Sequence, residues 1–280
     1  MIHYAPSSSA DALRDVPMQP SPMGEREAGR LSSEEIANLS KAREARWRPG
    51  LEDQPLHSEI FASVSNASGA GVALALARDA VRSQTRDPLA EADDWRHVLW
   101  VQDRRAVELS GRPYLHGLPR DLRERLIHVE VKTPEDALFA LEEGLKCRDL
   151  ACVIGEIVGN PSSLDFTASR RLSLTAEKHG MALWLVRLDS EADLSSARMR
   201  WRVEPAPSLI PSWNTEAPGQ PRWDAELFRA RSHAPGQWII SDDETALRAQ
   251  RASNRVRRAQ QHFGPALARQ RRFWHPGGGL

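Results

Sequence analysis

The sequence predicts an α/β fold in which helices cover both faces of a mainly parallel β-sheet, with antiparallel strands added toward the carboxyl end. Several short runs are apolar on both faces, notably residues 150–155 and 181–186, as strands buried within a parallel sheet are. These runs alternate with segments of helical pattern, which indicates repeated strand–helix–strand units. Beyond Leu188 the pattern changes to polar–apolar alternation, which is typical of antiparallel strands.

The first part of the chain differs from the rest in composition. Residues 1–30 are rich in Ser, Pro, Met and Ala without periodicity, which is typical of a disordered or loosely attached arm. Residues 32–35, Ser-Ser-Glu-Glu, resemble a capping box, which predicts a helix as far as about Trp47. We therefore assign residues 1–50 to an amino-terminal arm and helix, partly disordered.

The predicted core domain covers residues 51–244. Thr133 and Pro134 supply a hydroxyl cap and a first-turn proline for a helix that should end near Cys147. A second helix is expected over residues 165–179, with a stop at Gly180. Strands of the parallel sheet are expected at residues 97–101, 126–131, 150–157 and 181–186. Antiparallel strands at one edge of the sheet are expected at residues 198–204, 222–231 and 237–241.

The sequence carries no common motif of hydrolysis or metal binding. It has no G-x-S-x-G and no H-E-x-x-H, and none of its nine histidines form an i,i+4 pair, so we expect no metal and no cofactor. Cys147 and Cys152 are too far apart for a CxxC pair, which favours a structural role. No apolar run approaches the roughly 18–20 residues of a transmembrane helix, and the first residues lack the pattern of a secretory signal. We expect a cytoplasmic protein.

Positive charge is concentrated near the carboxyl end. The chain has 38 Lys and Arg against 38 Asp and Glu, yet residues 245–275 contain eight arginines and no acidic residue. We therefore assign residues 245–280 to a basic, Arg-rich tail. Its first arginines recur at three- and four-residue spacing, which would align them on one face of a helix. The candidate residues for binding a partner or nucleic acid are Arg248, Arg251, Arg255, Arg257, Arg258, Arg269, Arg271, Arg272, Phe273 and Trp274.

Three interpretations of this tail remain open. Guanidinium groups interleaved with aromatic rings suit phosphate contact and base stacking on DNA. The same composition suits a segment that docks on an acidic protein surface. It is also typical of a disordered tail that only increases solubility.

Several segments, in their order along the chain, resemble the ImuA family, whose members are similar to RecA in core fold. The segments are Leu56-His57-Ser58-Glu59-Ile60, Val98-Leu99-Trp100-Val101-Gln102, Pro134-Glu135-Asp136-Ala137-Leu138, Leu164-Asp165-Phe166-Thr167-Ala168-Ser169-Arg170-Arg171-Leu172, Arg200-Trp201-Arg202-Val203 and Pro221-Arg222-Trp223. The resemblance implies a RecA-like core and a role in damage-induced (SOS) mutagenesis and translesion synthesis. Its implied partners are an ImuB-like polymerase homologue, an error-prone replicative-type polymerase and RecA itself. It also implies association with the nucleoid after DNA damage.

The stretch that corresponds to the phosphate loop of a RecA-type ATPase lacks the chemistry of that loop. An active loop reads G-x-x-x-x-G-K-[S/T], because backbone N–H groups and a lysine hold the phosphates. Residues 61–77 contain no lysine or arginine. Ser68, Gly69 and Gly71 remain as a degenerate nucleotide loop, or as small residues that permit close packing at a strand–helix turn. Glu156, where a RecA-type fold could hold magnesium, is then interpreted as a vestigial or capping carboxylate.

The sequence as a whole favours a non-catalytic adaptor with a RecA-like core. Two alternatives stay open. One is a weak ATPase with a degenerate nucleotide site, which nucleotide-dependent thermal stabilisation would reveal. The other is a cell-division inhibitor of the SulA type, although the Trp-rich segment after Leu188 and the basic tail argue against that smaller architecture.

Overall fold

The computed structural model describes Ser32, Glu34, Pro49 and residues 55–85, 95–243 and 246–252. The chain divides into two units, Met1–Ala42 and Arg43–Leu280. In the first unit only Ser32 and Glu34 are described, and Glu34 is helical. The arm predicted for residues 1–30 and most of the helix predicted after Ser32 therefore lie outside the described residues. Everything below concerns the second unit.

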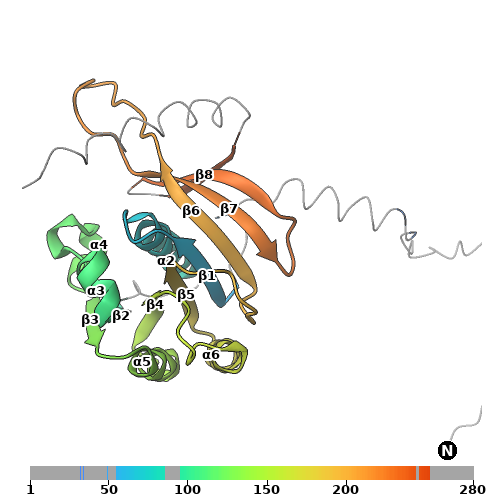
Figure 1. Cartoon of the computed structure of the whole chain (residues 1–280). Helices are drawn as coiled ribbons and strands as arrows, with labels where there is room; N and C mark the ends of the chain where they lie inside the picture. Colours follow the sequence, from blue (N-terminus) through green and yellow to red (C-terminus); the bar gives the residue numbers. More distant parts are fainter. Residues whose placement is uncertain are drawn as a thin grey trace, which may run out of the picture. The chain divides into compact units, whose positions relative to one another are not determined.

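A single nine-stranded sheet runs through the described part of the second unit in the order β3-β2-β4-β5-β1-β6-β7-β8-β9 (Figure 1). The six strands from β3 to β6 are mutually parallel, and β7, β8 and β9 are antiparallel. The parallel strands are β1 (His57–Ala62), β2 (His97–Asp103), β3 (Leu126–Val131), β4 (Leu150–Val158), β5 (Ala182–Leu188) and β6 (Met199–Ala206). The antiparallel strands are β7 (Arg222–Ala230), β8 (Gly236–Asp242) and β9 (Leu247–Arg251). The predicted fold class is confirmed. The strand expected as antiparallel at residues 198–204 is corrected, because β6 runs parallel to β1 and is antiparallel only to β7.

Helices cover the two faces of the parallel strands separately. One face carries α2 (Ser68–Thr85), with α3 (Arg104–Ser110), the short 3₁₀ helix η1 (Leu115–Gly117) and α4 (Arg120–Arg123). The other face carries α5 (Pro134–Lys146) and α6 (Phe166–His179) (Figure 1). Each face has its own apolar cluster, with Ile60, Leu76 and Trp184 in the first and Leu141 and Leu183 in the second. Alternate residues of one strand thus serve two cores, which explains the continuous apolar runs.

Local signals in the sequence define the helix ends. The Thr133 hydroxyl accepts a hydrogen bond from the Asp136 amide at 3.1 Å, and Pro134 occupies the first turn of α5. At α6 the Asp165 carboxylate accepts from the Ala168 amide at 2.7 Å, and Gly180 ends the helix in the left-handed conformation, with φ of 64°. These caps satisfy backbone groups that a helix leaves unpaired, which is why the predicted boundaries agree with the structure.

The antiparallel strands extend the sheet around α2 (Figure 1). Trp201 on β6 and Trp238 on β8 are fully buried, and their rings meet edge to face at 5.9 Å between centroids. They belong to the same apolar cluster as Leu76 of α2, so the alternating segments after Leu188 bury one face against this helix.

The start of the predicted tail is part of the sheet. Strand β9 pairs with β8, and Ala249 at its centre is buried. The helix expected for Arg248 and Arg251 is therefore wrong: in a strand, residues three apart point to opposite faces of the sheet. The free edge of β8 offers unpaired backbone groups, and pairing with them outweighs the local helical pattern. The remainder of the tail, from residue 253, lies outside the described residues.

The free cysteines occupy the predicted positions. Cys147 caps the carboxyl end of α5, and Cys152 is buried within β4. Among the described residues, no helix combines the length and the apolar character needed to cross a membrane.

Candidate functional site

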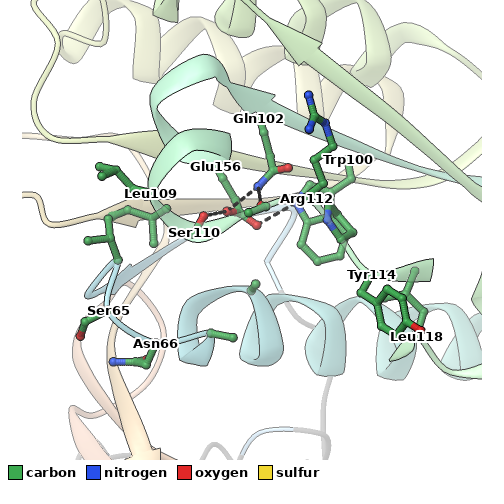
Figure 2. A pocket seen from close by; sticks show the side chains of 16 residues that line it. Ser65, Asn66, Trp100, Gln102, Leu109, Ser110, Arg112, Tyr114, Leu118 and Glu156 are labelled. Atoms are coloured by element: carbon green, nitrogen blue, oxygen red, sulfur yellow. Dashed lines mark hydrogen bonds between the residues drawn. The ribbon is translucent and has the colours of Figure 1, made fainter. Parts of the chain in front are cut away.

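A pocket of about 470 Å³ lies where β2 and β4 end, beside the loop that joins β1 to α2 (Figure 2). Parallel α/β sheets commonly bind ligands at this edge, since loops diverge there to opposite faces. The walls come from residues 64–67 of the loop, from the carboxyl ends of the two strands and from the segment that follows α3. Its lining includes the side chains of Ala70, Trp100, Gln102, Ser110, Tyr114 and Glu156.

The glycines of the degenerate loop are packing residues. A Cβ atom on Gly69 would lie 2.7 Å from Val186 Cγ1 and 2.8 Å from Ala62 Cβ, closer than such atoms approach. A Cβ atom on Gly71 would lie 2.6 Å from the ring of Trp223. The close packing that the sequence predicts here is present: α2 approaches β1, β5 and β7 because these positions have no side chain.

Several backbone N–H groups of the loop between β1 and α2 donate hydrogen bonds to acceptors within the chain. With Gly69 aligned to the second glycine of a phosphate loop, Ala70 stands at the position of the lysine. The Val64 amide donates to Asp189 Oδ1 at 3.1 Å, and the Ser65 amide donates to Ser63 Oγ at 3.2 Å. The amide of Ser68, the buried first residue of α2, donates to Asn66 Oδ1 at 2.9 Å. A phosphate loop presents such N–H groups to its nucleotide, whereas here they donate to acceptors within the chain.

Asp189 reaches this loop from the end of β5 in an uncommon backbone conformation. Its φ is 45°, the one positive value for a residue other than glycine in the described ranges. Its own amide donates to Ala62 O at 2.9 Å, so two hydrogen bonds hold it against the β1–α2 loop. This conformation places the Asp189 carboxylate, instead of a phosphate group, where it accepts a hydrogen bond from the Val64 amide.

Glu156 on β4 forms the polar floor of the pocket (Figure 2). Trp100 Nε1 donates to Glu156 Oε1 at 2.9 Å, and Gln102 Nε2 donates to Oε2 at 3.1 Å. The Ser110 hydroxyl lies 3.5 Å from Oε2. Burial raises the pKa of the Glu156 carboxyl, and these three hydrogen bonds only partly offset the effect. The site thus contains a desolvated carboxylate whose hydrogen-bond donors are all uncharged.

A second link connects this floor to the edge strand β3. His128 Nε2 lies 2.8 Å from Gln102 Oε1, which fixes the Gln102 amide so that its N–H₂ group faces Glu156 and the carbonyl of Gly111. Burial lowers the pKa of His128, and the nearby Arg112 lowers it further. A neutral His128 with Nε2 protonated fits this chain of donors. His128 is thus a hydrogen-bonded residue of an otherwise apolar strand.

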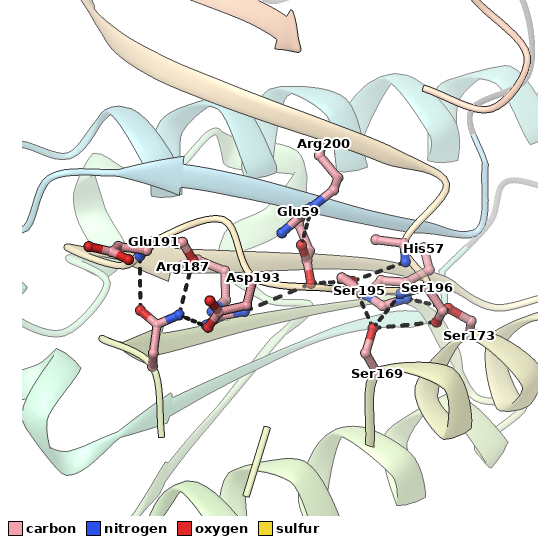
Figure 3. Close-up of polar contacts among 12 residues, drawn as sticks. His57, Glu59, Ser169, Ser173, Arg187, Glu191, Asp193, Ser195, Ser196 and Arg200 are labelled. Atoms are coloured by element: carbon pink, nitrogen blue, oxygen red, sulfur yellow. Dashed lines mark hydrogen bonds and ion pairs between the residues drawn. The ribbon is translucent and has the colours of Figure 1, made fainter. Parts of the chain in front are cut away.

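A separate polar cluster lies on the α6 face of the sheet, and its charged members Glu59, Arg187 and Arg200 are at most 3% exposed (Figure 3). Glu59 on β1 accepts from Arg200 Nε at 2.7 Å and from the Ser195 hydroxyl at 2.7 Å, and Arg187 Nη1 lies 3.9 Å away. The Arg200 guanidinium also covers the rings of Phe61 and Phe228, at 5.0 and 5.6 Å from their centroids. The cluster joins β1, β5, β6 and β7, so its arrangement indicates a structural role.

His57 extends this cluster toward α6. Its Nδ1 lies 2.7 Å from the Ser173 hydroxyl, and burial lowers its pKa to about 4. The ring is therefore neutral at physiological pH.

The sequence-predicted site residues are distributed over three places. Ser68, Gly69 and Gly71 lie beside the pocket. Arg248 pairs with Asp243, and Arg251 lies over the Trp238 ring at 5.7 Å, both at the β9 edge of the sheet. Eight candidates lie outside the described residues: Arg255, Arg257, Arg258, Arg269, Arg271, Arg272, Phe273 and Trp274.

Sequence reasoning missed Trp100, Gln102 and Tyr114 as pocket residues. Gln102 carries a usable signal, because a polar residue directly after an apolar parallel strand lies at the edge where ligands bind. Within the described ranges, His, Cys, Asp and Glu side chains nowhere gather in a group of three that could hold a metal ion.

Comparison with known proteins gives a bacterial relative. The chain is 34% identical over 160 residues to Protein ImuA of Caulobacter vibrioides, in strain NA1000 / CB15N and equally in strain ATCC 19089 / CIP 103742 / CB 15. The match covers 52% of this chain and 61% of the relative, so the chain spans about three fifths of the length of the proteins it matches. No family model matches the sequence.

Proposed function

Since this chain is homologous to Protein ImuA, which confirms its resemblance to the ImuA family, we propose that it is a non-catalytic adaptor in damage-induced mutagenesis. In this role its RecA-like core holds together an ImuB-like polymerase homologue and an error-prone polymerase, with RecA as a further partner. It acts in the cytoplasm, at the nucleoid after DNA damage. Translesion synthesis is then carried out by the partners and not by this chain.

The observation that carries the proposal is the closed state of the β1–α2 loop. Phosphoryl transfer depends on cations and backbone donors that stabilise the charge of the transferred phosphate. Here Ala70 stands at the position of the lysine, and the Asp189 carboxylate accepts from the Val64 amide. Glu156 adds a second carboxylate at the floor of the pocket. These features oppose the binding of a triphosphate and support an adaptor rather than an ATPase.

The surface around α2 offers room for partners. Two further hollows, of about 570 and 580 Å³, continue the pocket along this helix, and all share Leu118 as a wall. Their walls combine apolar side chains from Leu74, Leu118, Pro221 and Trp223 with the side chains of Arg78, Arg120, Arg123 and Arg222. Hollows that combine apolar and cationic walls suit the binding of a protein segment.

ATP hydrolysis by the purified protein tests the proposal. We expect no turnover above a buffer control, with or without single-stranded DNA, because the loop lacks a cation and its Val64, Ser65 and Ser68 amides donate within the chain. ATP turnover that recurs in independent preparations and is abolished by Ala70→Glu, which adds a carboxylate beside the pocket, would contradict the adaptor proposal. Thermal melting with and without Mg-ATP provides the matched binding measurement, and we expect no shift.

A further inference from the structure

We propose that the two hollows along α2 bind a segment of a partner protein in which apolar side chains lie between two acidic ones. The inference deepens the adaptor function and rests on it, because it gives the chemistry by which the adaptor selects a partner. The first hollow, of about 570 Å³, lies between the start of α2 and the start of β7. The second, of about 580 Å³, lies between the middle of α2 and α4.

Apolar walls are common to both hollows. The side chains that line each of them are Leu74, Leu118, Pro221 and Trp223. The Trp223 ring packs against α2 at Gly71, where a Cβ atom would lie 2.6 Å from the ring, so the helix holds the ring in place. Apolar surface that is already formed binds apolar side chains without first ordering a loop. The centre of the site therefore suits apolar side chains of the bound segment.

Cationic side chains lie on either side of these apolar walls. Arg222, at the start of β7, lines only the first hollow, and Arg120 and Arg123 of α4 line only the second. Arg123 donates to two backbone carbonyl groups, both at 2.8 Å, and Arg222 donates to one at 3.4 Å. Carbonyl groups orient a guanidinium group but leave its charge, and each guanidinium has five N–H donors. Among the described residues, no carboxylate forms an ion pair with any of the three arginines.

The other charges around the hollows balance one another. Asp242, the one carboxylate among the lining residues of the two hollows, pairs with Arg78 and Arg82. Arg78 also pairs with Asp121, at 2.9 Å. Two arginines and two aspartates thus cancel, and the net charge of the site is that of the three arginines without ion pairs. This positive charge on both sides of the apolar walls is complementary to acidic side chains at the two ends of a segment.

Charge and wall chemistry together identify the occupant. This chain's own residues 253–280 contain six arginines and no acidic residue, so repulsion opposes their entry. Single-stranded DNA would meet the cations, but its bases stack on aromatic rings, whereas the walls common to both hollows are mostly aliphatic and their one ring packs against α2. A protein segment with acidic ends and an apolar centre matches both features. We therefore assign the hollows to such a segment of a second protein.

Peptide binding to the whole protein tests the site. The probe is the acetylated and amidated peptide Glu-Leu-Ala-Leu-Glu, whose two leucines point to the same side when it is extended. Its matched controls are Gln-Leu-Ala-Leu-Gln, which has no charge, and Glu-Ser-Ala-Ser-Glu, which has no large apolar side chain. The indole N–H resonance of Trp223, assigned by NMR with Trp223→Phe, reports on the wall that both hollows share.

We expect the probe to bind at least about fivefold more tightly than either control. Two partly exposed ion pairs, or two partly buried leucines, each contribute about this much. Added salt should reduce the preference for Glu over Gln, because salt screens exposed charges. Equal binding of the probe and either control, or no binding of the probe, would overturn the proposal.

Substitution of one arginine on each side of the walls provides a second readout. Arg120→Gln with Arg222→Gln should remove the preference for Glu over Gln, and neither side chain is buried. The matched control is Arg148→Gln with Arg170→Gln, two exposed arginines that line neither hollow, and it should keep the preference. An unchanged preference in the first double variant would contradict the site. The peptide comparison uses the unaltered protein and stands even if that variant fails to fold.

Other occupants would give different results. A single-stranded thymidine oligonucleotide that bound at the Trp223 resonance more tightly than the probe would overturn the proposal in favour of nucleic acid. Self-association of the purified protein, measured by sedimentation and abolished by Arg120→Gln with Arg222→Gln, would overturn it in favour of a second copy of this chain. We expect neither result. Failure of the site would leave ATP hydrolysis and Mg-ATP melting unchanged, whereas ATP turnover would contradict the adaptor and leave peptide binding as it is.

Discussion

At the scale of single residues, small and acidic side chains determine the turn between β1 and α2. Gly69 brings α2 against Val186 and Ala62, and Ala70 leaves the position of the cation without charge. Asp189 then binds the Val64 amide from the end of β5. Each feature is local, and together they leave the turn without a cation beside a pocket with a carboxylate at its floor.

The packing role of Gly69 is testable by one added methyl group. Gly69→Ala places a Cβ atom less than 3 Å from two strand side chains, so the sheet or the helix must shift. We expect the free energy of unfolding to fall by about 1–3 kcal/mol, the usual effect of overpacking a core. Urea denaturation measures it. The control Ala67→Ser, at an exposed position of the same loop, should change stability by less than about 0.5 kcal/mol. An unchanged Gly69→Ala protein would mean that α2 does not contact β5 closely.

His57 should make stability depend on pH. Its pKa is about 4 in the folded protein and 6.5 when unfolded, so between these values the unfolded state binds the extra proton. The free energy of unfolding therefore rises by about 3 kcal/mol in total between about pH 4 and pH 6.5. This contribution of His57 is fully present above pH 6.5 and is lost as the pH falls toward 4. Denaturation at a series of pH values should show this slope in the native protein and its loss in His57→Leu. His116→Gln, at an exposed histidine, should keep the slope.

At the scale of elements, β4 is the strand on which both cores depend. It pairs with β2 on one side and β5 on the other, and all nine of its residues are buried. Its two faces serve the two apolar clusters, with Ile154 in one and Val153 in the other. The edge strand β3 differs, because it pairs on one side only and Ile127 on it is 41% exposed.

A charge in β4 should therefore abolish folding where the same charge in β3 does not. Val153 has no exposed surface, and Val153→Asp buries an unpaired carboxylate, which costs at least about 3 kcal/mol. We expect loss of soluble protein on expression. The matched variant Ile127→Asp should remain soluble and melt within a few degrees of the native protein. A soluble Val153→Asp protein with an unchanged melting curve would mean that β4 is not central.

At the scale of the whole molecule, β9 is the last strand among the described residues, and most of the tail arginines follow it in the sequence. Residues 247–251 complete the sheet edge, whereas six of the eight tail arginines come after Ala252. Folding and assembly should therefore depend on different parts of the carboxyl-terminal region. The boundary between them lies near residue 252 and not at residue 245.

Two truncations test this division. Ending the chain after Asp243 removes β9 and should lower the melting temperature by several degrees, about the effect of 1 kcal/mol or more. Ending it after Ala252 should leave the melting temperature nearly unchanged but weaken co-purification with the ImuB-like partner in a salt-sensitive way. Arg255→Ala with Arg257→Ala and Arg258→Ala should reproduce part of that loss, and Lys at these positions should restore most of it. Trp274→Ala should add a part that salt does not change. Full co-purification after truncation would place the binding surface on the core.

The sequence by itself determined four strands of the parallel core, the helices α5 and α6, and the absence of a cation from the β1–α2 turn. Their signals are local: apolar runs define strands such as β4, Thr133 and Gly180 define helix ends, and the absence of Lys and Arg from residues 61–77 is read directly. Only the tertiary structure decided that Arg248 and Arg251 lie in a strand, that Asp189 binds the loop 125 residues before it, and that Glu59 pairs with Arg200. These contacts join residues far apart in the chain, and a pattern confined to a few neighbours cannot encode which distant edge or donor a segment meets. The pocket around Glu156 depends on local signals and on distant contacts alike: the glycines beside it are visible in the sequence, whereas its aromatic walls come together only in the fold.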